Sequence, residues 1–461
     1  MPLFSKILIA NRGEIACRVI KTAKRLSIKT VAVYSEADAA ARHATMADEA
    51  VLIGPPSALE SYLSIPNIIA AAKKTDADAI HPGYGFLSEN ADFARACEEA
   101  GITFIGPAAD VIHLMGNKAA AKRYMTAAGV PCIPGYEGAD QSDETLAGEA
   151  QKIGFPLMVK AAAGGGGRGM RLVEQEKKLL KSLATARSEA ERSFGSGELI
   201  LEKAILNPRH IEIQVFGDGR GRAVHLYERD CSIQRRHQKV IEEAPSPAVS
   251  PDLRERMGRV AAEATAAINY AGAGTFEFLL DDAGNFYFLE MNTRLQVEHP
   301  VTEIITDLDL VEWQIRIAAG EDLPLKQADI PLNNHAIEAR LYAEDPYKGF
   351  LPKPGILTRW QAPEGPGMRT DHGLLDGVEV TPWYDAMIAK VIGHGKNREE
   401  ARQNLIKALE QTVDEGLVTN RRFLIHCLEH PEFEKGAATT GFIEAHFPKD
   451  KLKELGAGLA Q

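Results

Sequence analysis

The sequence predicts an α/β fold built from several lobes, and three observations support this prediction. Short apolar strands alternate with helical segments over the first hundred residues, a spacing typical of a parallel sheet. A glycine run at residues 164–169 lies between two further apolar strands. Two aromatic and aliphatic runs flank the segment 281–285, whose Asp, Gly and Asn residues favour a hairpin turn.

The composition is that of an ordinary globular protein with material for more than one domain. Of the 461 residues, 45% are hydrophobic and 25% are charged. The formal net charge of -11 argues against a nucleic-acid partner, because such proteins carry basic patches. We find neither a transmembrane-length apolar run nor a secretory signal, so we expect no membrane association. Five scattered cysteines without a CxxC pair favour the cytoplasm or another reducing compartment, such as the mitochondrial matrix.

The N-terminal lobe is expected to span residues 1–115. Its predicted elements, in order, are a strand at 6–10, a helix at 14–26, a strand at 30–34, a helix near 66–74, a strand at 79–80, a helix near 90–100 and a strand at 103–106. This alternation of strand and helix predicts parallel pairing. The first strand-to-helix turn lacks G-x-G-x-x-G, which argues against a dinucleotide site.

A helical linker is predicted at 116–134, where Pro131 and Pro134 break the chain. The segment 135–203 carries its own strands and a polar helix near 175–193, and its size suits a small mobile lid. The remaining predicted units are a central lobe at 204–330, a C-terminal α/β lobe at 331–447 and a tail at 448–461, frayed from residue 452.

The glycine run predicts a phosphate-binding loop. Glycines let backbone N–H groups approach and cradle phosphate oxygens, and they permit hinge motion. Lys160, at the end of the preceding strand, is placed to neutralise phosphate charge. The loop is not of the Walker A type, since no Gly-Lys-Ser/Thr follows. The alternative is a flexible linker, which would be richer in serine and would lack flanking cations.

The hairpin brings carboxylates together. A turn at residues 283–284 places Glu277 directly opposite Glu290, and by the same register Thr275 opposite Asn292. Like charges at directly opposed positions destabilise a sheet unless a cation lies between them. An oxygen-only set of Glu277, Glu290 and Asn292 suits Mg²⁺ bound together with substrate phosphates.

Arg294 follows on the same strand face, and an arginine beside a metal clamp indicates a site for anions. The alternative is a surface hairpin with solvated carboxylates. Phe276, Phe278 and Phe288 make both strands apolar, however, and carboxylates in such strands are rarely just solvated.

Longer runs of sequence resemble the biotin carboxylase family within the ATP-grasp superfamily. The resembling runs are Asn11 to Ala16, His81 to Asn90, Glu228 to Lys239 and Glu290 to Pro300. The resemblance covers residues 4–447. Within the family, residues 337–346 and 439–442 look most like the N-terminal portion of acyl-CoA carboxylase α subunits. The resemblance to the family implies an ATP-grasp fold with a Rossmann-like N-terminal lobe, a mobile glycine-rich lid and a C-terminal biotin carboxylase lobe.

The resemblance implies ATP- and bicarbonate-dependent carboxylation of biotin, the first half-reaction of an acyl-CoA carboxylase. In the family model bicarbonate attacks the γ-phosphate to give carboxyphosphate, and the biotin ureido nitrogen then attacks the CO₂ released. The implied cofactors are ATP and two Mg²⁺ or Mn²⁺ ions. The implied partners are a biotin carboxyl carrier, a carboxyltransferase and a second copy of the chain in a homodimer.

Biotin is expected as a carrier-bound substrate, because carriers attach it to a lysine between two methionines and no such triplet occurs here. We expect either a stand-alone subunit or the N-terminal portion of a longer α subunit, since few residues follow 447.

The resemblance also implies residue roles. For ATP it implies Lys118, Lys160, Gly164, Gly165, Gly166, Gly167, Gly169, Glu202, Lys203, Ile205, His210, Gln234, His237, Glu277 and Glu290. For the metal it implies Glu277, Glu290 and Asn292, and for bicarbonate Lys239, Arg294, Gln296, Val297 and Glu298. Lys239, Arg294, Glu298 and Arg340 form the implied catalytic set. In it Glu298 is the base for the bicarbonate proton and Arg340 stabilises the enolate of the biotin ureido group. Tyr84 is expected to line the biotin pocket.

Two other hypotheses stay open. Another ATP-grasp ligase, of the carbamoyl-phosphate or purine-pathway type, would share the metal carboxylates but not the run 81–90. A non-catalytic ATP-binding regulator would be expected to lack at least one of the key acidic and basic residues, all of which are present. Without the resemblance, these residues could also be structural: Arg294 and Glu298 could simply pair with each other, and Arg340 could be an ion-pair arginine.

Overall fold

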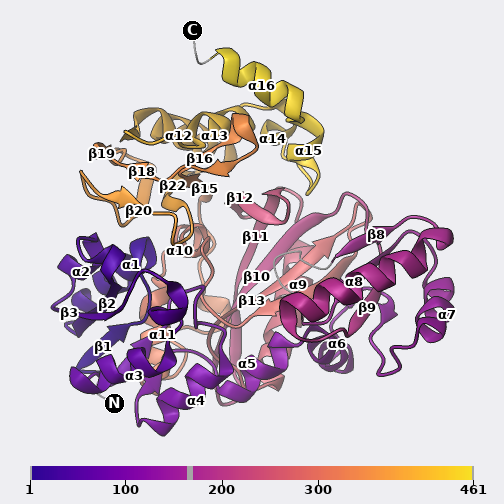
Figure 1. The fold of residues 1–461 in the computed structure, drawn as a ribbon, viewed down its shortest axis with the longest axis horizontal. Coiled ribbons are helices and arrows are strands. Elements are labelled where there is room, and N and C mark those ends of the chain that lie inside the picture. The colour runs from indigo at the N-terminus through magenta and orange to yellow at the C-terminus, as the bar shows by residue number, and fades with distance from the viewer. Residues whose placement is uncertain (1–2, 164–169, 459–461) are drawn as a thin grey trace.

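The computed structural model describes residues 3–163 and 170–458. Its N-terminal lobe contains a five-stranded parallel sheet in the order β3-β2-β1-β4-β5 (Figure 1). The strands are β1 (Lys6–Ile9), β2 (Lys29–Ser35), β3 (Glu49–Gly54), β4 (Ala79–His81) and β5 (Thr103–Phe104). The helices are α1 (Gly13–Arg25), α2 (Arg42–Met46), α3 (Ile65–Lys74), α4 (Ala91–Glu99) and α5 (Ala109–Gly116). The predicted parallel sheet is confirmed, while β3 and α2 were not predicted.

The lid segment has a sheet and a core of its own, on the right in Figure 1. Helix α6 (Lys118–Ala127) leads into it. Its strands β6 (Gly135–Tyr136), β7 (Leu157–Ala161), β8 (Arg171–Val173) and β9 (Leu199–Lys203) pair in the order β6-β9-β7-β8. Helices α7 (Asp143–Ile153) and α8 (Leu179–Phe194) pack on this sheet. Since the segment buries its own apolar side chains, it can move as a unit.

The largest sheet has eight strands in the order β14-β13-β10-β11-β12-β15-β22-β20. These are β10 (Arg209–Asp218), β11 (Ala223–Arg235), β12 (Gln238–Ala244), β13 (Ala271–Leu280), β14 (Phe286–Asn292), β15 (His335–Tyr342), β20 (Met368–His372) and β22 (Met387–Gly395). Antiparallel pairing of β12 with β15 carries this sheet across the predicted boundary at residue 330. Helices α9 (Pro251–Ala267), α10 (His299–Thr306) and α11 (Leu310–Ala318) follow in the central part.

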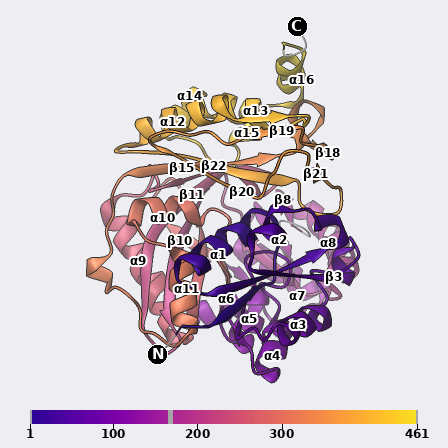
Figure 2. The same cartoon turned by 90° about the vertical axis from the view of Figure 1, so that its left-hand side faces the viewer.

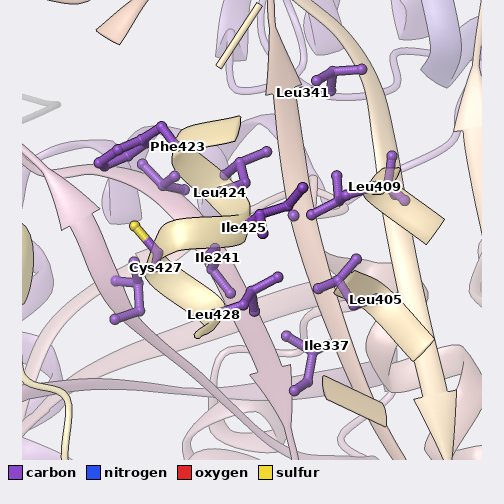
Figure 3. Packing of buried hydrophobic residues seen from close by; sticks show 14 of the residues in the cluster. Ile241, Ile337, Leu341, Leu405, Leu409, Phe423, Leu424, Ile425, Cys427 and Leu428 are labelled. Carbon is purple, nitrogen blue, oxygen red and sulfur yellow. The ribbon is translucent and has the colours of Figure 1, made fainter. Parts of the chain in front are cut away.

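The C-terminal lobe packs helices against β15 and β22. Helices α12 (Arg398–Gln411) and α13 (Arg421–Leu428) contribute Leu405, Leu409 and Phe423 to a core with Ile337 and Leu341 of β15 (Figure 3). Short strands complete the lobe: β16 (Glu344–Asp345), β17 (Leu351–Pro352), β18 (Gly355–Ile356), β19 (Arg359–Gln361), β21 (Glu379–Val380) and β23 (Val413–Glu415). Helices α14 (Pro431–Glu434) and α15 (Phe442–His446) follow.

The expectation of a frayed tail is wrong for most of its length. Residues Lys449–Gly458 form helix α16, which packs against the turn at Pro346–Lys348. Leu452 is only 7% exposed and joins the C-terminal core, with Leu455 packed beside it. Two leucines three residues apart lie on one helix face, and their burial holds the helix down. Among the described residues, we find no helix of the length and hydrophobicity needed to span a membrane.

Candidate functional site

A cavity of about 1650 Å³ lies between the lid, the large sheet and the C-terminal lobe. The predicted nucleotide residues among its lining are Lys118, Lys160, Glu202, Lys203, Ile205, His210, Gln234, His237, Glu277 and Glu290. Every nucleotide candidate that the structure describes is therefore in one cavity. The glycine candidates Gly164, Gly165, Gly166, Gly167 and Gly169 lie outside the described residues.

Two lysines converge on one carboxylate on the lid side of the cavity. Glu202 of β9 pairs with Lys160 of β7 and with Lys122 of α6, whose Nζ lies 3.0 Å from Glu202 Oε1. Burial raises the pKa of Glu202, but Lys160 and Lys122 outweigh it and leave the pKa below its ordinary value. The charged triad joins α6 to the lid sheet. Lys122 was not predicted, because it reaches the site only through the packing of α6.

The register of the hairpin confirms the predicted carboxylate pair, but the predicted turn is wrong by one residue. Glu277 lies opposite Glu290, and Thr275 opposite Asn292. Beyond Glu277 the register shifts, so that Leu280 faces Phe286.

A three-residue loop and a bulge explain the shift. Asp281 closes the loop, because its Oδ1 accepts N–H bonds from Ala283 and Asn285, and Gly284 has φ +79°. The extra residue in β14 is Leu289, which restores the predicted register at Glu290. Consecutive side chains normally point to opposite faces, but at this bulge both Leu289 and Glu290 line the cavity.

A row of charged side chains crosses four strands of the large sheet. Arg229 on β11, Glu212 on β10, Glu277 on β13 and Glu290 on β14 are successive partners in the register. Glu212 was missed by the sequence analysis and is 0% exposed, paired with Arg229. The signal was the alternation of polar residues in the apolar run 210–215.

Lys239 of β12 links this row to the next part of the site. Its Nζ lies 2.6 Å from Glu212 Oε2, 2.8 Å from Glu277 Oε1 and 2.7 Å from Glu298 Oε1. Burial lowers the pKa of Lys239, but these three carboxylates raise it well above the ordinary value. The lysine is therefore held charged at the centre of a buried anionic cluster.

Glu277 is the most heavily bonded carboxylate of the row. It also pairs with His210 Nε2 at 3.0 Å and accepts hydrogen bonds from Asn292 Nδ2 at 2.9 Å and Gln296 Nε2 at 3.2 Å. Burial raises the pKa of Glu277, but Lys239 and His210 hold it well below its ordinary value. Glu290 is more open and pairs with Lys118 at the start of α6.

Glu298 and Arg340 form the far end of the cluster. Arg340 Nη2 lies 3.1 Å from Glu298 Oε2, and Arg340 Nε lies 2.5 Å from Glu242 Oε1. Burial raises the pKa of Glu298, but Lys239, Arg340 and Arg229 hold it well below the ordinary value. Arg340 is thus a buried ion-pair residue, and Glu298 is held ionised by its direct partners Lys239 and Arg340 and by the nearby Arg229.

Arg294 does not pair with Glu298. Its Nε donates to Glu89 Oε2 at 2.8 Å, its Nη1 to Gln296 Oε1 at 2.8 Å and its Nη2 to Asn292 Oδ1 at 3.1 Å. Glu89 was not predicted as a site residue, although it lies in the run 81–90 that resembles the family. Its carboxylate also accepts the Thr293 N–H at 3.1 Å, so it anchors the site loop to the N-terminal lobe.

Glu14 and Lys390 link Tyr84 to Val297. Tyr84 donates its hydroxyl to Glu14 of α1. Lys390 of β22 lies 3.2 Å from Glu14 Oε1 and donates to the Val297 carbonyl at 2.8 Å. This contact joins the N-terminal lobe, the site loop and the C-terminal lobe.

Models of three known domains match the chain. Residues 3–112 match the biotin carboxylase N-terminal domain, residues 117–326 the ATP-binding domain of the carbamoyl-phosphate synthase L chain, and residues 338–445 the biotin carboxylase C-terminal domain. The two flanking domains distinguish the chain from the other ATP-grasp ligases considered.

Curated relatives agree along nearly the whole chain. Biotin carboxylase of Halalkalibacterium halodurans is 55% identical over 444 residues, which are 96% of this chain and 98% of that protein. The mitochondrial methylcrotonoyl-CoA carboxylase subunit alpha of Rattus norvegicus is 54% identical over 450 residues, 97% of this chain but 63% of that subunit. The chain thus spans less than two thirds of the longer relative.

A solved structure shares the fold. The biotin carboxylase domain dimer of Hydrogenobacter thermophilus 2-oxoglutarate carboxylase, in complex with MgADP, ADP and bicarbonate, superposes with a TM-score of 0.93. It is 50% identical, and the match covers 97% of this chain and 98% of that one. The predicted ATP-grasp fold class is confirmed, and the chain belongs to the biotin carboxylase family.

Proposed function

We propose that this chain carboxylates carrier-bound biotin with ATP and bicarbonate. The observation that carries the proposal is the continuous ionic chain Glu277–Lys239–Glu298–Arg340. It starts in the large cavity and ends at a buried guanidinium of the C-terminal lobe. A nucleotide, an anion and an acceptor therefore have adjacent places in one site.

The nucleotide would occupy the cavity, with Lys118 and Lys160 at its phosphates and Glu202, Lys203 and Ile205 at its base. His210, Gln234 and His237 would complete the contacts. Both lysines already pair with carboxylates, Lys118 with Glu290 and Lys160 with Glu202. Phosphate oxygens would take over these contacts, which is how a charged cavity binds an anion at small reorganisation cost.

Glu277, Glu290 and Asn292 would hold Mg²⁺ or Mn²⁺, with two ions as the family resemblance implies. Their donor set fits, because carboxylate and amide oxygens suit a hard divalent cation and the two acids are directly opposed in the register. When bound, the ion neutralises charge that grows on the transferring phosphoryl group.

Lys239, Arg294, Gln296, Val297 and Glu298 would grip bicarbonate. The low pKa of Glu298 makes it a weak base while Lys239 and Arg340 hold it. An arriving anion would draw Lys239 toward itself, and the basicity of Glu298 would rise as the Lys239–Glu298 contact loosens. Arg294 would bind the same anion without having held Glu298. Bicarbonate would thus activate its own base: its proton would pass to Glu298 as its oxygen attacks the γ-phosphorus, ADP would leave, and carboxyphosphate would form.

Arg340 and Tyr84 would serve the biotin side. A guanidinium held by Glu242 and Glu298 is a fixed positive charge for the enolate oxygen of the ureido group. Biotin would arrive on a carrier domain, and a carboxyltransferase would take the carboxyl group onward. We also propose a homodimer, closure of the 135–203 lid on ATP, and a reducing compartment, the cytoplasm or the mitochondrial matrix.

Assays on the purified chain with free biotin test the function. We expect ATP hydrolysis that requires bicarbonate and rises with biotin. Turnover that ignores biotin but needs an amine or amino acid would support another ATP-grasp ligase. Tight ATP binding without turnover would support a regulator.

A matched pair of variants tests the base. Glu298→Gln should abolish bicarbonate-dependent turnover while leaving MgADP binding intact. Glu303→Gln is the control, because Glu303 lies on the adjacent helix α10 and also pairs with two cations, Arg18 and Arg369. Equal loss of turnover in both variants would contradict a specific role for Glu298.

A further inference from the structure

Lys390 is a fully buried cation that none of the roles above uses. It is 0% exposed and lies on β22, opposite Arg340 of β15 and Asp371 of β20. Burying an ammonium group is costly unless it is paired and hydrogen-bonded. Its surroundings therefore indicate what keeps it there.

Three lobes supply those surroundings. Nζ donates to the Val297 carbonyl at 2.8 Å, and it lies 3.2 Å from Glu14 Oε1 and 3.9 Å from Asp371 Oδ2. It also lies 6.0 Å from the centre of the Tyr84 ring. Burial lowers the pKa of Lys390, but Glu14, Glu338 and Asp371 outweigh it, so the amine stays protonated and keeps donating.

The acceptor of this bond is the peptide unit that precedes Glu298. A peptide is planar, so a fixed Val297 carbonyl also fixes the direction of the Glu298 N–H and the start of its side chain. Glu298 is the residue before α10, and its side chain contacts Lys239 and Arg340. Lys390 thus acts on Glu298 through the backbone.

The same ammonium group reaches the biotin side through Glu14. Tyr84 donates to the Glu14 carboxylate that Lys390 binds. The lobes are tightly seated here: a Cβ on Gly373, just after β20, would lie 2.8 Å from the Gly13 carbonyl carbon. Figure 2 shows α1 beneath β20 and β22 at this junction.

We propose that Lys390 is a positioning residue that holds the 297–298 peptide for bicarbonate and ties it, through Glu14, to Tyr84. The inference rests on the proposed function, because it takes Val297 and Glu298 as bicarbonate residues. It predicts that bicarbonate affinity and biotin stimulation depend on a side chain that touches neither substrate.

The test compares Lys390→Met with Arg402→Met. Arg402 is also a buried cation, and its Nη1 donates to the Leu428 carbonyl at 2.9 Å, away from the cavity. Lys390→Met should raise the KM for bicarbonate about 10- to 100-fold, the range expected for a lost charged hydrogen bond, and leave the KM for ATP within about twofold. Biotin stimulation should fall, whereas Arg402→Met should leave the ratio of the two KM values unchanged.

Lys390→Met removes the cation that pairs with the buried Glu14 carboxylate. The loss of this ion pair can by itself destabilise the fold. The double variant Glu14→Gln/Lys390→Met removes both charges and should show the same bicarbonate defect with normal MgADP affinity. A parallel rise in the KM for ATP and for bicarbonate, or no bicarbonate defect in either variant, would overturn the inference.

Arg294→Gln separates this inference from the function. If Arg294→Gln raises the KM for bicarbonate while both Lys390 variants do not, the positioning role fails and the site assignment stands. If Arg294→Gln leaves that KM unchanged, the bicarbonate assignment itself fails.

Discussion

Glu290→Gln separates a metal ligand from a structural carboxylate. Glu290 lies opposite Glu277 in the register and directly follows the bulge at Leu289. It pairs only with Lys118 among the described residues, and the side chains are 28% and 22% exposed. Glutamine keeps the shape and removes the charge, so the variant isolates the electrostatic contribution.

The structure predicts a small effect on folding and a large one on turnover. A partly exposed ion pair contributes about 0.2–1 kcal/mol, which would move the melting temperature by about 2 °C or less. Two unit charges about 4 Å apart at an effective dielectric constant of about 20 interact by about 4 kcal/mol, which is the minimum expected between a carboxylate and a divalent ion. Loss of that interaction in the transition state corresponds to about 10³-fold in kcat/KM for MgATP.

The assay is bicarbonate-dependent ATP hydrolysis as a function of Mg²⁺ concentration, with thermal denaturation in parallel. Glu321→Gln is the matched control, because Glu321 pairs with Arg316 at 29% and 31% exposure on the surface. Glu290→Gln should need more Mg²⁺ and lose turnover, and Glu321→Gln should do neither. A large drop in melting temperature with near-normal turnover would refute the reasoning.

Three further predictions follow from the same contacts. Burial, reinforced by Asp385, raises the pKa of Glu344 from 4.5 to about 7, so its contribution to stability is full below pH 4.5 and is lost as pH rises through 7. The free energy of unfolding of Glu344→Gln should therefore exceed that of the wild type by a margin that grows between pH 5 and pH 8, to at most about 3 kcal/mol. A margin that does not change with pH would contradict this. Glu212→Gln leaves Arg229 and Lys239 short of a buried partner and should cost about 3–5 kcal/mol of stability; melting like wild type would disprove it. Hydrogen exchange of residues 163–170 should slow when ATP saturates the site, and unchanged protection would argue against lid closure.

The sequence predicted those parts of the site that depend on local pattern. Glu277 and Glu290 could be paired because strand alternation and a turn signal both lie within about twenty residues. The bulge at Leu289 could not be predicted, since loops of two and three residues share the same Asp, Gly and Asn signals. The predicted register at the acids was right because the bulge offsets the longer loop.

The residues that were missed are those placed by pairing between distant segments. Glu212 enters the site because β10 pairs with β13, and Glu89 because the N-terminal lobe packs against the 293–298 loop. The alternation in 210–215 marks Glu212 as a strand residue, but neither sequence region shows which distant segment it contacts. The packed helix α16 was missed for a different reason: only two leucines mark its buried face, and their importance depends on the lobe beneath.

The sheet shared by β12 and β15 limits where this molecule can be cut. Residues 241–244 pair with residues 336–339, so a fragment ending near 330 would present the backbone donors and acceptors of β12 to solvent. Such bare edges recruit other strands and promote aggregation. Residues 117–326 and 338–445 match separate domain models but share one sheet, so an engineered exchange of the C-terminal portion would have to carry its neighbouring strands along.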